Sequence, residues 1–357
     1  MQSVKHHFPV ANSHTYLNTA SCGLFSDALV QWRREQDTQL LEGGSLFRDQ
    51  HKGHMLSIRN SIARFFSTEA DRIALVPNFS FGWNSLLEGL PSKSRFLLIN
   101  GDYPSLSWPI ERRGFEMVRT TLNAQLETNI QQAVQQYRPD VLVLSMVQYI
   151  SGIKIDLDFL SQLKKDHPEL LIVADGTQYL GTEAYNFEQG PIDVLGASAY
   201  KWMLAGYGNG FFMVKPAARQ RFDLKTMGYN SADADFDKKH DIEFVGYMEP
   251  GHQDALNYGS IEQSILLFED WGREKIHQHL AKLSTEAAKA LMQKGVWTGP
   301  ASQRNRPSTI FNIDGDAPLF ERMQQAGIIA SLRGDGIRVS FHIYNDLQDL
   351  EALLAVL

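Results

Sequence analysis

The chain has 357 residues, of which 43% are hydrophobic and 21% are charged, and its formal net charge is −7. This length and composition are typical of a folded protein with one large domain and a smaller one. The acidic balance and the absence of a polybasic block argue against binding to nucleic acid or to an anionic membrane.

The sequence predicts a cytoplasmic protein without a membrane span. Its N-terminal stretch "MQSVKHHFPVANSHTYLN" has no apolar core of signal-peptide length. Apolar runs such as "FLLI" and "LLIV" are too short to cross a bilayer. Cys22 is the only cysteine, so no intrachain disulfide can form, which fits a reducing compartment.

Short apolar runs alternate with helical patterns through the middle of the chain. Two helical patterns, 128–137 and 156–168, separate the first three runs. Near-continuous apolar strands in such an alternation predict a mainly parallel sheet covered by helices on both faces. The expected strands are Phe96–Asn100, Val141–Ser145, Leu170–Ala174, Val194–Ser198 and Gly210–Val214.

The second half of the chain changes character. A polar stretch, 224–253, predicts a crossing segment or a mobile loop. One long helical pattern, 260–295, follows it and ends at Gly295. Strand-like and helix-like segments then alternate to the C-terminus, which predicts a smaller α+β domain.

Polar residues stand at the ends of successive expected strands. Asp175 directly follows "LLIVA", Gln178 comes three residues later, and Ser198 to Lys201 follow the next run. Ligands of open α/β sheets bind beyond the carboxyl ends of the strands. A glycine-containing turn within 76–87 opens a helix, and a helix start favours phosphate.

Lys201 lies in the apolar stretch "SAYKWMLAGYGNGFFMV". Because lysine is seldom buried, this side chain either extends its charge to solvent or uses its amine as a nucleophile. An amine that can form a Schiff base, Asp175 aimed at a ring nitrogen and a phosphate cradle together describe a pyridoxal phosphate site. Burial would lower the pKa of the Lys201 amine.

These motifs together resemble the class V aminotransferase family of fold-type I pyridoxal phosphate enzymes, which includes cysteine desulfurases, selenocysteine lyases, kynureninases and isopenicillin epimerase-like proteins. The resemblance rests on "DGTQ", "SAYKW", "GNGFFMV", "YLNTASCGLFS" and "IRVSFHIYND", and it covers nearly the whole chain. It implies an α/β fold with a mainly parallel seven-stranded sheet between helices, plus a smaller α+β domain. The implied division is an N-terminal segment, 1–20, a large cofactor-binding domain, 21–255, and a small C-terminal domain, 256–357.

The resemblance also implies roles for individual residues around the cofactor. Lys201 would form the Schiff base, and Asp175 would pair with the pyridinium nitrogen. Gln178 would bind the ring hydroxyl. Ser198 and Tyr200 would contact the phosphate, although the family often has histidine at the position of Tyr200.

Further residues are assigned to the cofactor by the same resemblance. Backbone N–H groups around Ser80 and Phe81 would complete the phosphate cradle. Tyr103 would stack on the cofactor ring. Gln148 would lie near the cofactor face, beside Tyr149.

Substrate and partner contacts complete the set that the resemblance implies. Arg338 would bind the α-carboxylate of an amino acid substrate through its planar guanidinium, and Asn18 would contact the substrate from the N-terminal segment. His252 would reach the phosphate of the partner subunit in a homodimer, although the family usually has threonine there.

Departures from the family pattern narrow the reaction. Desulfurases of this group take sulfur onto a cysteine ahead of the C-terminal arginine motif, but the segment "GIIASLRGDGIRVS" has none and Cys22 lies far from it in sequence. A persulfide-forming desulfurase is therefore disfavoured. The leading prediction is a transferase; the alternatives are an epimerase, a lyase for cysteine, selenocysteine or kynurenine-like substrates, and a cofactor-binding protein without turnover.

Structural interpretations compete at each of these positions. Lys201 alone could be a solvated residue after a strand, Asp175 a helix cap and Gln178 a turn residue. His51 and His54 have a spacing that could hold a metal, but no third ligand is apparent, so no metal site is expected.

Overall fold

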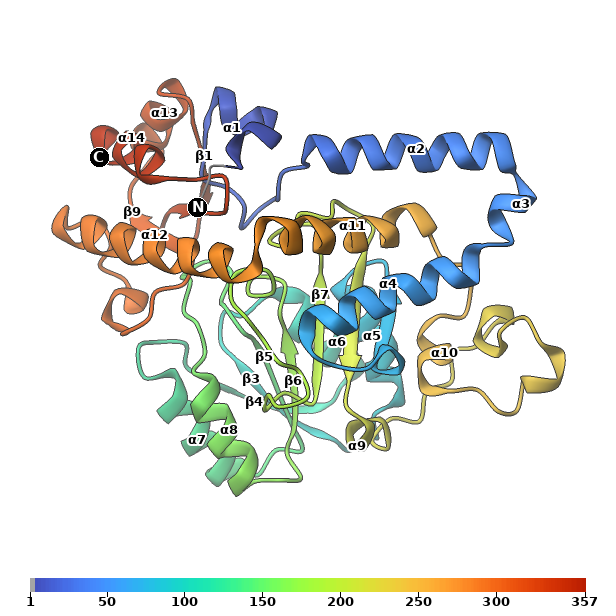
Figure 1. The fold of residues 1–357 in the computed structure, drawn as a ribbon. Coiled ribbons are helices and arrows are strands. Elements are labelled where there is room, and N and C mark those ends of the chain that lie inside the picture. The colour runs from blue at the N-terminus through green and yellow to red at the C-terminus, as the bar shows by residue number, and fades with distance from the viewer. Residues whose placement is uncertain (1–3) are drawn as a thin grey trace.

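A computed structural model describes residues 4–357 of the chain (Figure 1). A seven-stranded sheet forms its centre, with the strand order β2-β8-β7-β6-β5-β3-β4. In that order the strands are β2 (Ile73–Val76), β8 (Gly210–Val214), β7 (Val194–Ser198), β6 (Leu171–Asp175), β5 (Val141–Ser145), β3 (Arg95–Ile99) and β4 (Glu116–Thr120).

The central sheet is mainly parallel. Only β8 runs against its neighbours, pairing antiparallel with both β2 and β7, while the pairs from β7 to β4 are parallel. The expected fold class is thereby confirmed. Three expected strands have the bounds of β5, β7 and β8, and the other two are shifted by one residue, since the structure has Arg95–Ile99 and Leu171–Asp175.

Helices cover both faces of the sheet because its strands carry apolar side chains on both sides. Val141 and Val143 of β5 face the core shared with α5 (Phe79–Gly89) and α6 (Pro104–Arg113). Leu142 and Leu144 face the opposite core. That second core also takes side chains from α4 (His51–Phe66), α7 (Leu126–Tyr137), α8 (Leu157–Asp166) and α11 (Ala255–Trp271).

A second, antiparallel sheet forms near the C-terminus. Its order is β11 (Ser331–Arg333), β12 (Gly336–Ser340) and β9 (Ile310–Asp314). The N-terminal segment joins this part of the fold, because β1 (Thr15–Tyr16) pairs with β10 (Ile328–Ile329) and Asn18 bridges to Ser340. The helices here are α12 (Arg273–Gln293), α13 (Ala317–Gln325) and α14 (Leu347–Val356).

The single long helix expected over 260–295 is wrong. The structure has two helices, α11 and α12, separated at Gly272, whose φ of 89° and ψ of 100° cannot continue an α-helix. The apolar pattern runs across the break because both helices bury side chains in one core.

The remaining segments are short or peripheral. The polar stretch 224–253 is irregular, as expected, apart from α10 (Phe244–Met248) and two short 3-10 helices, η3 (Tyr229–Ala232) and η4 (Phe236–Lys238). The other elements are η1 (Lys5–His7), α1 (Pro9–Ser13), α2 (Asp27–Gly43), α3 (Ser45–Arg48), η2 (Ala70–Arg72), α9 (Pro216–Arg219) and η5 (Pro300–Gln303).

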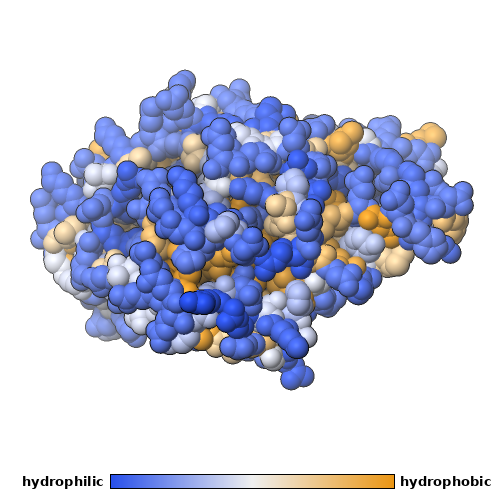
Figure 2. Space-filling model, turned by 90° about the horizontal axis from the view of Figure 1, so that it is seen from below, coloured by the Kyte–Doolittle hydropathy of each residue, from blue (hydrophilic) through white to orange (hydrophobic). Residues whose placement is uncertain are grey.

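Hydrophilic residues dominate the face of the molecule seen in Figure 2, with apolar side chains in scattered groups between them. Within residues 4–357, no helix combines the length and apolar character needed to cross a membrane.

Candidate active site

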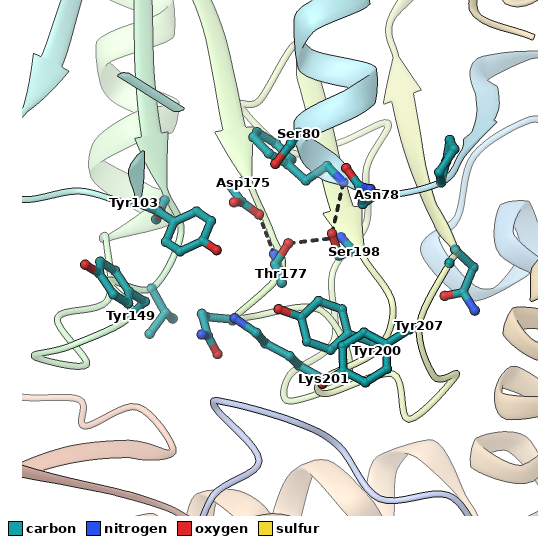
Figure 3. Close-up of a pocket in the computed structure, with 17 residues that line it drawn as sticks. Asn78, Ser80, Tyr103, Tyr149, Asp175, Thr177, Ser198, Tyr200, Lys201 and Tyr207 are labelled. Atoms are coloured by element: carbon teal, nitrogen blue, oxygen red, sulfur yellow. Dashed lines mark hydrogen bonds between the residues drawn. The ribbon is translucent and has the colours of Figure 1, made fainter. Parts of the chain in front are cut away.

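A cavity of about 370 Å³ opens where β6 and β7 end and α5 begins (Figure 3). This is the carboxyl edge of the parallel sheet, where the strand connections of open α/β folds leave room for ligands. Its lining is rich in hydroxyl, amide and carboxylate groups and comprises Pro77, Asn78, Phe79, Ser80, Tyr103, Ser145, Val147, Tyr149, Asp175, Thr177, Gln178, Ser198, Tyr200, Lys201, Tyr207, Gly208 and Asn209.

Lys201 is buried, with 6% of its surface exposed, and its side chain lines the cavity. The amine Nζ lies 5.3 Å from the ring centre of Tyr200 and 5.7 Å from that of Tyr103. Burial lowers the pKa of this amine to about 8, although the Asp175 carboxylate opposes the shift. A substantial fraction of the amine is therefore neutral and nucleophilic near pH 8.

Asp175 is the last residue of β6 and is buried. Its Oδ1 accepts a hydrogen bond from the backbone N–H of Thr177 at 2.8 Å. Burial raises the pKa of the carboxyl group to about 6, while the Thr177 contacts and the Lys201 charge act in the opposite direction. The cavity thus holds one acid and one base whose pKa values have moved toward each other.

The start of α5 forms one wall of the cavity. Asn78 caps this helix, its Oδ1 accepting from the N–H of Phe81 at 2.9 Å. Ser198 Oγ accepts from the N–H of Phe79 at 2.9 Å, and the N–H of Ser198 donates to Thr177 Oγ1 at 3.0 Å (Figure 3). The helix start and the end of β7 are thereby fixed against each other.

Four tyrosines line the cavity that holds the lysine amine. Tyr103 meets Tyr149 edge-on, with ring centres 5.1 Å apart, and Tyr200 stacks on Tyr207 at 4.7 Å. Burial raises the pKa of the Tyr200 hydroxyl, so it stays protonated and can donate a hydrogen bond. These rings give the cavity apolar walls with hydroxyl groups at their tips.

The expected residues fall into two groups. The cavity brings together Lys201, Asp175, Gln178, Ser198, Tyr200, Ser80 and Tyr103. The lining does not include Phe81, Gln148, His252, Arg338 or Asn18.

Hydrogen bonds explain the position of three of these residues. The side chain of Gln178 donates to the carbonyl of Ala20 at 2.9 Å and accepts from the indole N–H of Trp202 at 2.7 Å. Gln148 holds its own turn by accepting from the N–H groups of 150 and 151, so it shapes the loop beside the cavity. The N–H of Phe81 is already engaged by the cap.

Arg338 lies buried beside the cavity on β12. Its Nη1 donates to the carbonyl of Tyr149 at 2.6 Å, and its buried Nε has no hydrogen-bond acceptor among residues 4–357. Burial and the neighbouring Arg333 charge lower the pKa of the guanidinium to about 10, so it stays charged at neutral pH. Asn18 accepts from Ser331 Oγ at 2.7 Å on the adjoining strand.

A family comparison decides between the possible chemistries of this cavity. The profile of the family described as aminotransferase class-V matches residues 27–353, most of the chain. The chain belongs to the class V aminotransferase family. The resemblance in the sequence is therefore confirmed, and the protein is a pyridoxal phosphate-dependent enzyme.

Solved structures show that this class V enzyme shares a fold with sulfur-transforming proteins. The apo cysteine desulfurase from Thermococcus onnurineus NA1 has a TM-score of 0.87 at 17% identity over 100% of this chain and 97% of that one. The cystine C-S lyase C-DES, in complex with its product cysteine persulfide, has a TM-score of 0.87 at 17% identity over 98% of each chain.

The cysteine desulfurase CsdA from Escherichia coli has a TM-score of 0.82 at 16% identity, over 99% of this chain and 96% of that one. At such identities the likeness concerns the fold. No curated protein sequence matches the chain.

The cavity of this class V enzyme fits its cofactor. It offers an amine with a lowered pKa, a buried carboxylate and a helix start with serine hydroxyls. The buried Oδ1 of Asn209, a lining residue, lacks a hydrogen-bond partner within residues 4–357. Across the same residues, no group of three or more His, Cys, Asp or Glu side chains is placed to hold a metal ion.

Sequence reasoning missed several residues of the site. Thr177 bonds both Asp175 and Ser198, a role indicated by its place two residues after an aspartate, as in Asx-turns. Asp102 accepts from the N–H of Ser145 at 2.8 Å and from its hydroxyl at 2.6 Å. The charge of Asp102 also helps raise the pKa of Asp175.

Cys22, which lies far from the C-terminal arginine motif in sequence, comes close to the site in the folded chain. Hydrogen bonding to Cys22 raises the pKa of the Tyr207 hydroxyl, on the cavity lining, to about 12. The thiol is also close enough for its charge to act on the pKa of Lys201. Its neighbour Gly23 donates its N–H to the carbonyl of Tyr200 at 3.0 Å, which draws the segment to the cavity.

Proposed function

We propose that the enzyme transforms an amino acid through a Schiff base between Lys201 and pyridoxal phosphate, with transamination as the leading reaction. One observation carries the proposal: a buried lysine amine with a lowered pKa shares a cavity with a buried carboxylate at the carboxyl edge of the sheet. The cofactor supplies an electron sink conjugated with the substrate amine.

The residues of the chain divide the remaining work. The Asp175 carboxylate would stabilise a proton on the ring nitrogen of the cofactor, and Arg338 would offer its unpartnered Nε to the substrate α-carboxylate. With cofactor and substrate bound, the Lys201 amine would accept the α-proton of the substrate, since its lowered pKa leaves it partly neutral near pH 8. Ser80 at the start of α5 and Ser198 at the end of β7 would hold the phosphate, where the helix dipole favours an anion.

A homodimer in the cytoplasm is part of the proposal. Large apolar side chains stay exposed at the end of the molecule that carries α2 and α3: Leu41 is 84% exposed and Leu46 is 74% exposed (Figure 1). Phe236 of the neighbouring loop is 78% exposed. A second subunit would cover such side chains, and His252, exposed and outside the lining of its own cavity, would reach the partner's phosphate.

A C–S lyase is the second candidate, because the similar structures include a cystine C-S lyase and cysteine desulfurases. It differs from the transaminase in its product. A lyase releases pyruvate from cysteine or cystine, whereas a transaminase leaves the cofactor in its pyridoxamine form.

The deciding experiment is an absorption spectrum of the purified protein, reconstituted with pyridoxal phosphate, beside Lys201→Ala. A visible band in the wild type that borohydride traps on residue 201, and that the variant lacks, supports the proposal. Adding amino acids to that band then separates the two reactions by their products. A wild type without any band that depends on Lys201 would refute the proposal.

A further inference from the structure

The hairpin of β11 and β12 places two arginines on one face. Ser331 is paired with Arg338, and Arg333 is paired with Gly336. Paired residues of an antiparallel ladder point to the same side, and side chains alternate along each strand. Arg333 and Arg338 are therefore diagonal neighbours on a single face, at about 7–8 Å.

That face of the hairpin is the one turned toward the cavity. Arg338 donates to the carbonyl of Tyr149, a lining residue. The hairpin turn packs against the same loop, since a Cβ on Gly334 would lie 2.9 Å from Cγ2 of Ile150.

The charge of these two arginines is not balanced by protein carboxylates. Neither Arg333 nor Arg338 belongs to any of the ion pairs formed within the described part of the chain, 4–357. The Arg333 charge nevertheless acts on the site, because it lowers the pKa values of both Lys201 and Arg338. Like charges at this spacing repel each other, and an anionic ligand would relieve the repulsion.

We infer that Arg333 binds a second anionic group of the substrate, so that the substrate is an amino acid with a carboxylate at the far end of its side chain. This inference rests on the proposed function, in which Arg338 takes the α-carboxylate. The diagonal spacing then suits the two ends of one short dicarboxylic amino acid. Arg333 is exposed and outside the cavity lining, so it would select the substrate without touching the reacting atoms.

The test uses the pyridoxal phosphate-loaded enzyme and two ligands that cannot react, glutarate and butyrate, followed by the shift of the cofactor band. Arg333→Gln is expected to weaken glutarate binding about tenfold or more, the loss typical of one charge-assisted contact, and to change butyrate binding less than about twofold. Arg333→Lys keeps the charge and is expected to retain most of the glutarate affinity. Arg322→Gln, an exposed arginine on α13, is the matched control and is expected to change neither.

A second readout is the preference for L-glutamate over L-glutamine in kcat/KM, which Arg333→Gln should abolish. Equal loss of glutarate and butyrate binding in Arg333→Gln would overturn the inference, because it indicates a structural role. Unchanged glutarate binding would overturn the inference as well, because Arg333 would then contact only solvent and not the ligand. A wild type that binds both ligands equally refutes the inference while leaving the Schiff base intact, whereas a missing cofactor band refutes the proposed function itself.

Discussion

The buried Lys201 destabilises the folded apoprotein, and the same burial makes its amine reactive. Its pKa falls from 10.5 to about 8 on folding, so the charged form is penalised by about 3 kcal/mol. The folded state binds fewer protons than the unfolded state between these values, so this penalty is complete below pH 8 and disappears as pH rises to 10.5.

Lys201→Met should therefore stabilise the apoprotein at pH 7 by up to about 3 kcal/mol, and the gap to wild type should close toward pH 10.5. Denaturant unfolding of both apoproteins across this pH range measures the effect. Lys165→Met, at an exposed lysine of α8 outside the cavity, is a suitable control and should show no gap that closes with pH. A gap that widens with pH would contradict the sign of the shift.

Cofactor uptake should follow the same two groups. The Asp175 carboxyl, with a pKa raised to about 6, ionises first, and the Lys201 amine becomes neutral through about 8. Because attack on a carbonyl needs the neutral amine, the uptake rate of pyridoxal phosphate by apoprotein should rise with a midpoint near pH 8 and level off above about pH 9. Stopped-flow absorbance gives this profile; a midpoint near 10.5 would show that the amine is solvated.

Substitution of Cys22 tests directly whether the enzyme is a desulfurase. The chain has no other cysteine, so a persulfide-forming desulfurase would have to use this thiol. Because the segment ahead of Arg338 lacks a cysteine, we expect Cys22→Ser to keep most of the activity, within about threefold. The measurement is turnover of the amino acid that perturbs the cofactor band. A hundredfold or greater loss of turnover would support a desulfurase that uses Cys22.

Among the elements, the helix pair α11 and α12 depends on one backbone conformation. Gly272 has a φ of 89°, which costs other residues about 1–2 kcal/mol. Gly272→Ala should lower the free energy of unfolding by that amount. Gly53→Ala in α4 is the matched control, since its Cβ would meet nothing within 4 Å, and we expect it to be neutral or stabilising by up to about 1 kcal/mol. Equal effects in chemical denaturation would contradict the argument.

The break at Gly272 also shows which elements the sequence could predict. Strands β5, β7 and β8 were predicted with their observed bounds because each is an apolar run buried on both faces. The pairing of β1 with β10 was not predicted, since it joins two residues to two others more than 300 positions away. The break at Gly272 was not predicted either, because the helical spacing of apolar residues around a glycine does not indicate its backbone φ.

The residues of the site also divide into those that the sequence could predict and those that it could not. Lys201, Asp175 and Ser198 could be found because they end or follow apolar strands. Asp102 and Asn209 could not, because their importance lies in hydrogen bonds between segments that meet only in the folded chain. Local patterns therefore indicate where a site lies, and tertiary contacts decide which neighbours hold it in place.

At the scale of the whole molecule, His252 is the residue that would make the dimer a unit of function. It lies outside the cavity lining of its own chain and follows the loop that carries the exposed Phe236. If it completes the partner's phosphate site, the damage done by His252→Ala must appear in the other subunit. If the substitution instead only destabilised the fold, the activity of both sites would fall.

A heterodimer of one Lys201→Ala chain and one His252→Ala chain separates these cases. With shared sites, one of its two cavities receives a functional lysine from one chain and a functional histidine from the other, so about half of the wild-type activity should return. The heterodimer is isolated through two different tags, and each homodimeric variant is the control. No recovery would mean that His252 acts within its own chain, and a His252→Ala homodimer with full activity would mean that this histidine does not act at all. A protein that elutes as a monomer of 40.3 kDa would refute the shared site outright.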